Sequence, residues 1–235
     1  MAEAPARRWT GFAVLAGLLL LWEVSAAWWV NSSNWPRLSA VFVAMGSGLR
    51  SGELLEVFVS SLYRMTVGYA AGSVVGVATG LWLARSRWAR AALEPLLEGL
   101  RPIPIPAIVP PLILLLGVDN AMKIFVVAFA SFFPVFINTL GGVRAVDTTA
   151  LDVARTFQRG RLGTVWHVVL PASLPYILAG MRVSLALALI ITVVAEMIAG
   201  SAGIGYYIVT MQYAMRSGEM YAAILLLAAT GYTLN

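Results

Sequence analysis

Apolar runs about as long as a membrane span follow one another along this chain and leave room for few other architectures. Of its 235 residues, 60% are hydrophobic and only 11% are charged. A soluble domain of this length carries a much larger charged surface. Because each span takes about 20 residues, we predict an all-α membrane protein with about six transmembrane helices and no separate soluble domain.

The first run, residues 11–30, is longer than the core of about 7–15 residues that a cleaved signal peptide has. We therefore assign residues 1–30 to an N-terminal cytosolic segment and the first span. Residues 31–60 are predicted to be extracytoplasmic, with a short helix around 39–49, and residues 61–235 to form the membrane core. The remaining regular spans are expected at residues 61–84, 122–140, 172–195 and from 220 onward. Since the last run has only about 15 residues, we expect the natural protein to continue beyond Asn235.

Basic residues indicate the orientation of these spans. Most of them fall in three polar stretches: Arg7 and Arg8; Arg85, Arg87 and Arg90; and Arg144, Arg155, Arg159 and Arg161. Fewer lie in segments expected outside: Arg37, Arg50, Lys123 and Arg216. Cytosolic loops carry the excess of arginine and lysine, so the N-terminus is predicted to be cytosolic.

The second predicted span carries glycine at every fourth position: Gly68, Gly72, Gly76 and Gly80. Residues four apart share one helix face, so these glycines form a smooth strip. Such strips allow the backbones of two membrane helices to approach closely. We predict that this strip packs against a neighbouring span.

The third predicted span is rich in proline, which occurs at Pro102, Pro104, Pro106, Pro110 and Pro111. Proline lacks a backbone N–H and interrupts a regular helix. Broken backbone is not tolerated in contact with lipid. This segment is therefore expected to be irregular, and either covered by protein or lining a cavity.

One long polar loop, residues 141–167, interrupts the apolar pattern. Thr149 and Asp152 have the spacing of a helix-capping box, and Asp147 is an alternative N-cap. The expected helix would carry several small and apolar residues on one side: Ala150, Leu151, Ala154 and Phe157. A short amphipathic helix of this kind can insert into a groove of a soluble partner. The alternative is an ordinary loop whose arginines only set the topology.

The spacing in this loop resembles the coupling motif of ABC-importer permeases: Glu-Ala-Ala, three residues, Gly, nine residues, Ile, one residue, Leu-Pro. In that register the chain has Asp152, Val153, Ala154, then Gln158, Val168, Leu170 and Pro171. Two positions differ from the motif, because Gln158 stands in the place of glycine and Val153 in the place of alanine. Leu170-Pro171 would begin the next span, since proline is tolerated in a first helical turn.

Other family-like stretches occur in the same order along almost the whole chain. They are Trp22-Glu23, Ser61-Leu62-Tyr63-Arg64, Arg101-Pro102-Ile103-Pro104, Phe133-Pro134, Gly180-Met181-Arg182, Ala195-Glu196-Met197 and Gly203-Ile204-Gly205-Tyr206. Together they resemble the permease branch that serves nitrate, taurine and aliphatic sulfonates.

The resemblance implies a permease fold of five core helices plus one N-terminal helix, in the bacterial cytoplasmic (inner) membrane. It implies a translocation subunit that is not itself an enzyme, with a second permease copy in a homodimer. It also implies two ATPase subunits that bind ATP and Mg, and an extracytoplasmic solute-binding protein. Transport would proceed by alternating access, with a sulfonate, taurine or nitrate-like anion as the expected solute. The residues implied in ATPase coupling are Asp152, Val153, Ala154, Arg155, Phe157, Gln158, Arg159, Gly160, Leu170 and Pro171.

Three ionisable residues fall within apolar runs, where charge is costly and indicates function. Arg182 and Glu196 are about 21 Å apart along one helix, so they cannot pair within it. We expect Arg182 to lie on the translocation path, and Glu196 with Met197 to belong to an outer gate. A hydrogen bond in helix packing is the alternative for Arg182 and Glu196, and the favoured interpretation for Glu23.

The residues needed for metal binding and for nucleotide binding are missing from the sequence. The chain has no cysteine and one histidine, so no metal site is predicted. It has no glycine-rich phosphate loop ending in Lys-Ser/Thr, so ATP would bind another polypeptide. No nucleic-acid partner is indicated. Two rival functions stay open: an ion-coupled secondary transporter, which would need matching interrupted helices, and a membrane scaffold or sensor without transport.

Overall fold

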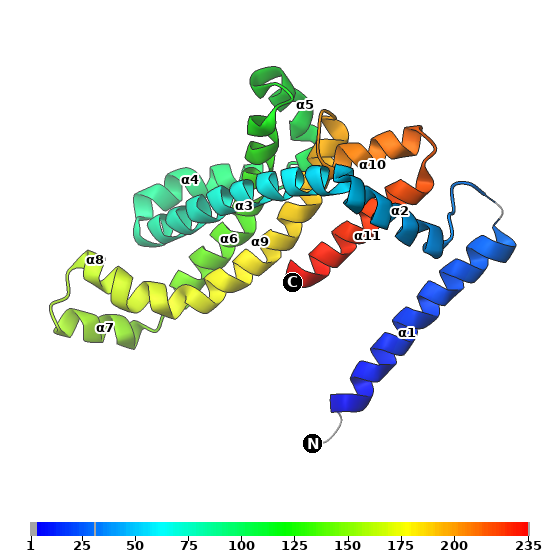
Figure 1. Ribbon diagram of the computed structural model, residues 1–235. Helices are drawn as coiled ribbons and strands as arrows, with labels where there is room; N and C mark the ends of the chain where they lie inside the picture. The colour runs from blue at the N-terminus through cyan, green and yellow to red at the C-terminus, as the bar shows by residue number, and fades with distance from the viewer. Residues whose placement is uncertain (1–3, 31, 235) are drawn as a thin grey trace.

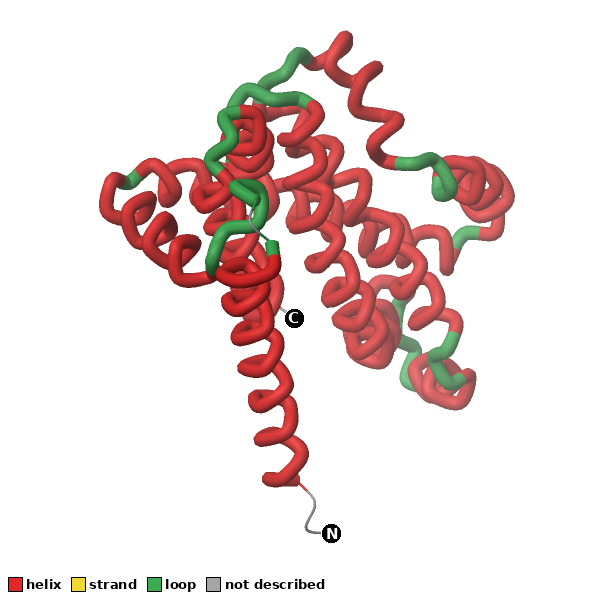
Figure 2. The backbone as a smooth tube through the Cα atoms, turned by 90° about the vertical axis from the view of Figure 1, so that its right-hand side faces the viewer, coloured by secondary structure: helices red, strands yellow, loops and turns green. Residues whose placement is uncertain are grey.

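The structure, a computed structural model, describes residues 4–30 and 32–234, and each regular element in these residues is a helix (Figure 1). The elements in chain order, with η for π-helical turns, are α1 (Ala4–Val24), η1 (Ser25–Trp29), α2 (Leu38–Ser51), α3 (Glu53–Arg85), α4 (Arg87–Leu100), α5 (Ile105–Leu116), α6 (Asn120–Arg144), α7 (Thr148–Thr156), α8 (Arg161–Thr164), η2 (Val165–Val169), α9 (Leu170–Ile198), α10 (Ile204–Tyr213) and α11 (Ser217–Leu234). Figure 2 shows the same helical backbone from the side. The predicted all-α class is confirmed.

Four helical stretches are long and apolar enough to cross a membrane: Thr10–Trp29, Glu53–Arg85, Asn120–Arg144 and Leu162–Ile198. The pair α4 and α5 passes the same test only together and is bent by 100° at its break, which raises the count to at most 5. The expected number, about six, is higher than this count. The difference is α11, in which Glu219 in the first turn and threonines in the last turns lower the apolarity.

The second span begins earlier than expected, at Glu53. The preceding residue, Gly52, has φ +83 and ends α2, the short helix predicted around residues 39–49. Glycine adopts this left-handed conformation without a Cβ clash. Glu53 and Glu56 then occupy the first turn of α3, where the positive end of the helix dipole stabilises their negative charges.

Helix α1 stands apart from the other helices and is joined to them at its C-terminal end (Figure 1). There the ring of Trp22 lies 5.3 Å from that of Trp35 and 5.5 Å from that of Tyr221. The Glu23 carboxylate accepts hydrogen bonds from the backbone N–H of Ser39 at 3.1 Å and from its hydroxyl at 2.8 Å. Glu23 thus caps α2, which is the packing role favoured from the sequence.

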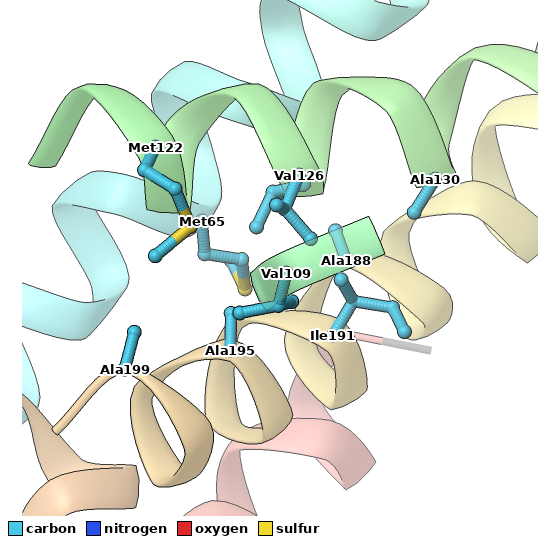
Figure 3. Packing of buried hydrophobic residues seen from close by; sticks show 10 residues of the cluster. Met65, Val109, Met122, Val126, Ala130, Ala188, Ile191, Ala195 and Ala199 are labelled. Atoms are coloured by element: carbon cyan, nitrogen blue, oxygen red, sulfur yellow. The ribbon is translucent and has the colours of Figure 1, made fainter. Parts of the chain in front are cut away.

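The core lies where α3, α6 and α9 pack together, with α5 over one end. Figure 3 shows Met65 of α3, Met122 of α6, Val109 of α5 and Ile191 of α9 meeting in this core. Small residues such as Ala188 stand between the larger ones, so the helices come close.

The four glycines of α3 face α6 at a distance that no larger residue would allow. An added Cβ would lie 2.7 Å from Val127 Cβ at Gly68, against the carbonyl oxygen of Ala128 at Gly72, 2.9 Å from the carbonyl oxygen of Phe132 at Gly76, and 2.7 Å from Thr139 Cβ at Gly80. Real Cβ contacts are longer than this, so each position would force a shift. The strip therefore determines how closely α3 and α6 approach.

The proline-rich third span is more regular than predicted. Irregular backbone is confined to residues 101–104, and α5 then continues through Pro110 and Pro111. Pro106 lies in the first turn of α5, where a backbone N–H would have no acceptor within the helix, so its absence costs no hydrogen bond. Pro110 and Pro111 follow one turn later, so their missing donors remove two helical hydrogen bonds without ending the helix.

Candidate functional site

The predicted coupling loop is a pair of short helices at one end of the molecule (Figure 1). We call residues 145–164, which contain α7 and α8, the coupling loop. The Asp147 carboxylate accepts a hydrogen bond from the backbone N–H of Thr149 at 2.9 Å and is the N-cap of α7. The capping box with Thr149 as N-cap is therefore wrong, and the alternative cap is correct. The helix begins two residues earlier than that box requires.

The coupling loop and the turn after it expose large apolar side chains. Phe157 and Leu162 are each 76% exposed, and Val153 and Trp166 are also exposed. Ala154 faces the other way and is buried. Phe157, which the sequence groups with Ala154, is the C-cap of α7 and is exposed where Ala154 is buried. Several large exposed apolar side chains in one short polar loop indicate a surface that binds a partner.

Charged residues flank this surface. The Asp152 carboxylate accepts a hydrogen bond from the Arg155 guanidinium at 2.8 Å, and both side chains are exposed. An exposed pair at this spacing contributes little stability, about 0.3–0.5 kcal/mol. Both groups therefore remain available to a partner.

Gln158, in the register position of the motif's glycine, has a left-handed backbone with φ +50. Its N–H donates to the Arg155 carbonyl at 2.8 Å, and the Arg159 N–H donates to the Ala154 carbonyl at 3.1 Å. These two bonds form a Schellman motif, whose left-handed residue is usually glycine. The turn therefore lies at Gln158. Gly160, the next glycine, is exposed and has nothing within 4 Å of a Cβ.

Gln158→Gly is expected to raise the free energy of unfolding by about 1 kcal/mol, because a side chain in the left-handed region costs about that much. Thermal unfolding of the purified protein in detergent would measure the gain. Met215, with φ +57 after α10, is a matched position, and Met215→Gly should give a gain of similar size. A loss of stability in Gln158→Gly would contradict this account of the turn.

The last two motif positions lie at the start of α9. Leu170 is its first residue, and Pro171 follows within the first turn. Upstream, α8 and η2 continue into α9 without a break. The coupling loop is thus covalently continuous with a helix that crosses the membrane.

At the opposite end of α9, Glu196 is fully buried in a polar cluster. Its carboxylate accepts hydrogen bonds from the Arg64 guanidinium at 2.6 Å, the Ser61 hydroxyl at 2.7 Å and the Gly205 N–H at 3.1 Å. Gly203, with φ +109, passes over this carboxylate so closely that a Cβ would collide with it. The segment between α9 and α10 is therefore built around Glu196.

A second buried cation belongs to this outer polar cluster. Lys123 of α6 is 1% exposed, and its ammonium donates to the Ser201 hydroxyl at 3.1 Å and to the Ala202 carbonyl at 3.2 Å. Arg64 also donates to Asn120 Oδ1 at 2.6 Å. Lys123, counted from the sequence among the charges of the outer side, is buried because the first turn of α6 packs under residues 199–202.

Sequence reasoning did not identify Arg64 as the partner of Glu196, or Lys123 as a member of the same cluster. A signal was available, since two cations in apolar segments require an acidic partner. Their separation along the chain, 132 residues for Arg64 and Glu196, hid the match.

Arg182 lies apart from Glu196, exposed near the middle of α9. It lines a cavity of about 150 Å³ with Leu185 and Leu189 of α9 and Gly231 of α11. Within the described residues, Arg182 has no hydrogen-bond or ion-pair partner. Met197 is partly exposed beside Glu196. In the described part of the chain, no three acidic or histidine side chains are grouped to hold a metal.

Comparison with known proteins gives one consistent family. The family model for the binding-protein-dependent transport system inner membrane component matches residues 72–235. The chain is 33% identical to the putative aliphatic sulfonates transport permease protein SsuC of Bacillus subtilis, over 94% of this chain and 80% of that protein. It is 32% identical to the nitrate import permease protein NrtB of Leptolyngbya laminosa, over 81% of this chain and 68% of that protein.

Among solved structures, the fold resembles a chain of the MetNI methionine ABC transporter with a TM-score of 0.65. The match covers 77% of this chain and 90% of that chain at 18% identity. At this identity the likeness concerns the fold alone.

Proposed function

The chain belongs to the family of binding-protein-dependent transport system inner membrane components, and from this premise we propose that it couples ATP hydrolysis on a separate ATPase to import of a small anion. As an ABC permease component it is a multi-pass protein of the inner membrane. The chain itself carries no enzyme activity in this proposal, and ATP and Mg bind the ATPase.

The observation that carries the proposal is the coupling loop. It presents exposed Phe157 and Leu162 on short, capped helices, with Asp152 and Arg155 beside them. An apolar side chain that enters a groove contributes most of the binding energy, and flanking charges fix the orientation. A partner that moved this loop would also move α9, since the two are continuous.

The complete transporter in this proposal has two copies of the chain, two ATPase subunits and an extracytoplasmic solute-binding protein. Alternating access would open the path between the two copies to each side in turn. Arg182 is proposed to lie on this path, and Glu196 with Met197 at its outer gate. The N-terminus is proposed to be cytosolic, which agrees with α1 and α9 running in the same direction in Figure 1.

The solute is proposed to be a sulfonate, taurine or nitrate-like anion. Two similar permeases are named for aliphatic sulfonates and for nitrate. Arg182 has no partner among the described residues, and a positive charge at mid-span is costly unless it faces water or an anion.

The direct test is affinity purification of the tagged full-length chain from its native cells in mild detergent. We expect a stoichiometric ATPase, and we expect Phe157→Ala combined with Asp152→Ala to abolish its recovery. Loss of a central apolar contact costs about 2 kcal/mol or more of binding free energy, about 30-fold in affinity. Trp88→Ala is a matched control, because Trp88 is an exposed aromatic residue of α4 outside the coupling loop.

Recovery of the intact chain without an ATPase would contradict the proposal. Solute uptake by vesicles without ATP would then support the ion-coupled secondary transporter. Recovery of a signalling protein in place of an ATPase would support the scaffold or sensor.

A further inference from the structure

A cavity of about 450 Å³ lies at the base of the coupling loop, between the C-terminal ends of α3 and α6. Its volume is in the range of sites that bind small ligands, about 300–1,000 Å³. Three arginines line it: Arg85 at the end of α3, and Arg155 and Arg159 in the coupling loop. Its apolar walls include Val143, Val146 and Val169. Two distant parts of the chain thus bring positive charge to one cavity.

The charges in this cavity are not neutralised by its own lining. Among the described residues that line it, none is a carboxylate. Arg155 pairs with Asp152, but that pair is exposed and weak. In the part of the chain that the structure describes, the guanidinium groups of Arg85 and Arg159 have no hydrogen-bond or ion-pair partner. Guanidinium groups bind phosphate in a two-pronged geometry, so a phosphate group matches this lining.

The position of the cavity favours a lipid as the source of that phosphate. Exposed tryptophans occur at the same end of the fold: Trp82 in the last turn of α3, Trp88 in the first turn of α4 and Trp166 in η2. Indole rings concentrate at the headgroup layer of a membrane. A ligand in this cavity would meet both arginines and valines, which suit the phosphate and the apolar part of a phospholipid.

We propose that this cavity binds the headgroup phosphate of an anionic phospholipid in the leaflet on the side of the coupling loop. Basic cavities between membrane helices at the cytosolic side are suited to such headgroups. The bound phosphate bridges Arg85 of α3 to Arg155 and Arg159, and so holds the coupling loop against the membrane helices. This inference concerns lipid binding and does not depend on the ATPase.

The test uses the full-length chain in detergent, with any subunits that copurify, and measures lipid binding by native mass spectrometry. Short-chain phosphatidylglycerol, phosphatidylcholine and inorganic phosphate are titrated separately. We expect phosphatidylglycerol to bind most tightly, and Arg85→Gln to weaken it about tenfold by removing a charged hydrogen bond. Arg87→Gln is the matched control, because Arg87 is exposed, lies two residues away and does not line this cavity. The affinity of the Arg87→Gln variant for phosphatidylglycerol should stay within about twofold of that of the unmodified chain.

Arg159→Gln is a second variant, in the coupling loop, and should weaken the binding of phosphatidylglycerol as Arg85→Gln does. Equal loss in Arg87→Gln and Arg85→Gln would show attraction to the general surface charge and overturn the proposal. Unchanged binding in both cavity variants would do the same. If inorganic phosphate bound as tightly as phosphatidylglycerol, the cavity would be a site for the free ion and the lipid proposal would fail. If phosphatidylcholine bound as tightly, the charge of the lipid would play no role and the proposal would also fail. Thermal unfolding of each variant confirms that the compared proteins are folded.

Discussion

Glu196→Ala is expected to lower the free energy of unfolding by about 3–5 kcal/mol, the cost of removing one partner from a buried ion pair. The Glu196 carboxylate accepts three hydrogen bonds in the outer polar cluster and is the acid nearest to Arg64. Its removal leaves the buried Arg64 without its ion-pair partner, close to the buried Lys123. Unfolding by a denaturing detergent in mixed micelles would measure the loss.

Two comparisons make this result specific to the buried cluster. Asp152→Ala removes the acid of an exposed pair and should cost only about 0.5 kcal/mol. The double change Arg64→Leu with Glu196→Leu should recover much of the lost stability, because no unpaired charge of that pair remains. Recovery stays incomplete, since Ser61 and Gly205 still lose their acceptor. Equal stability losses in Glu196→Ala and Asp152→Ala would contradict a structural role for the cluster.

Gly72→Ala is expected to lower the free energy of unfolding by about 3 kcal/mol, at the upper end for an overpacked core. The added methyl would collide with the Ala128 carbonyl oxygen, which belongs to the backbone of α6 and cannot rotate away. Relief therefore requires α3 and α6 to move apart along much of the strip. The same unfolding experiment in mixed micelles would detect the change.

Gly141→Ala provides a control of opposite sign. Gly141 also lies in a helix, but nothing is within 4 Å of the position of its Cβ. Alanine is the better helix former by about 0.8–1.0 kcal/mol, so this variant should be slightly more stable than the unmodified chain. A loss of similar size at both positions would mean that the glycines serve helix flexibility and not close packing.

Features with a local cause could be predicted from the sequence. The glycines of α3 recur with the helical period, so their common face follows from arithmetic, although the sequence does not identify α6 as the helix they meet. By contrast, the prediction that Leu170-Pro171 begins a span is wrong, because the helix runs without a break from residue 161 through η2 into α9. The left-handed turn falls at Gln158 because the helix cap determines it, and the motif register marked that position although its residue is unfavourable there.

Features that depend on distant partners could not be predicted. Arg64 and Glu196 come from different helices, and their pairing requires the packing of α3, α6 and α9 to be known first. Lys123 follows a predicted outer turn and has the pattern of an exposed loop charge. It is buried because residues 199–202 fold over it, which a hydropathy pattern does not show. The sequence predicted an irregular backbone for the whole proline-rich span, but the structure confines it to residues 101–104. The density of prolines does not show at which of them the helix breaks.

The uninterrupted helical stretch Leu162–Ile198 has a mechanical consequence. Its 37 residues make a rod about 55 Å long. One end carries the exposed apolar surface of the coupling loop, and the other end holds the carboxylate around which residues 199–205 fold. A tilt of about 10° at one end displaces the other by about 10 Å if the rod stays straight. The π-helical turn η2, with Pro171 and Pro175 soon after it, interrupts the regular hydrogen bonding near the coupling loop. The stiffness of this part therefore determines how much of the tilt reaches the far side.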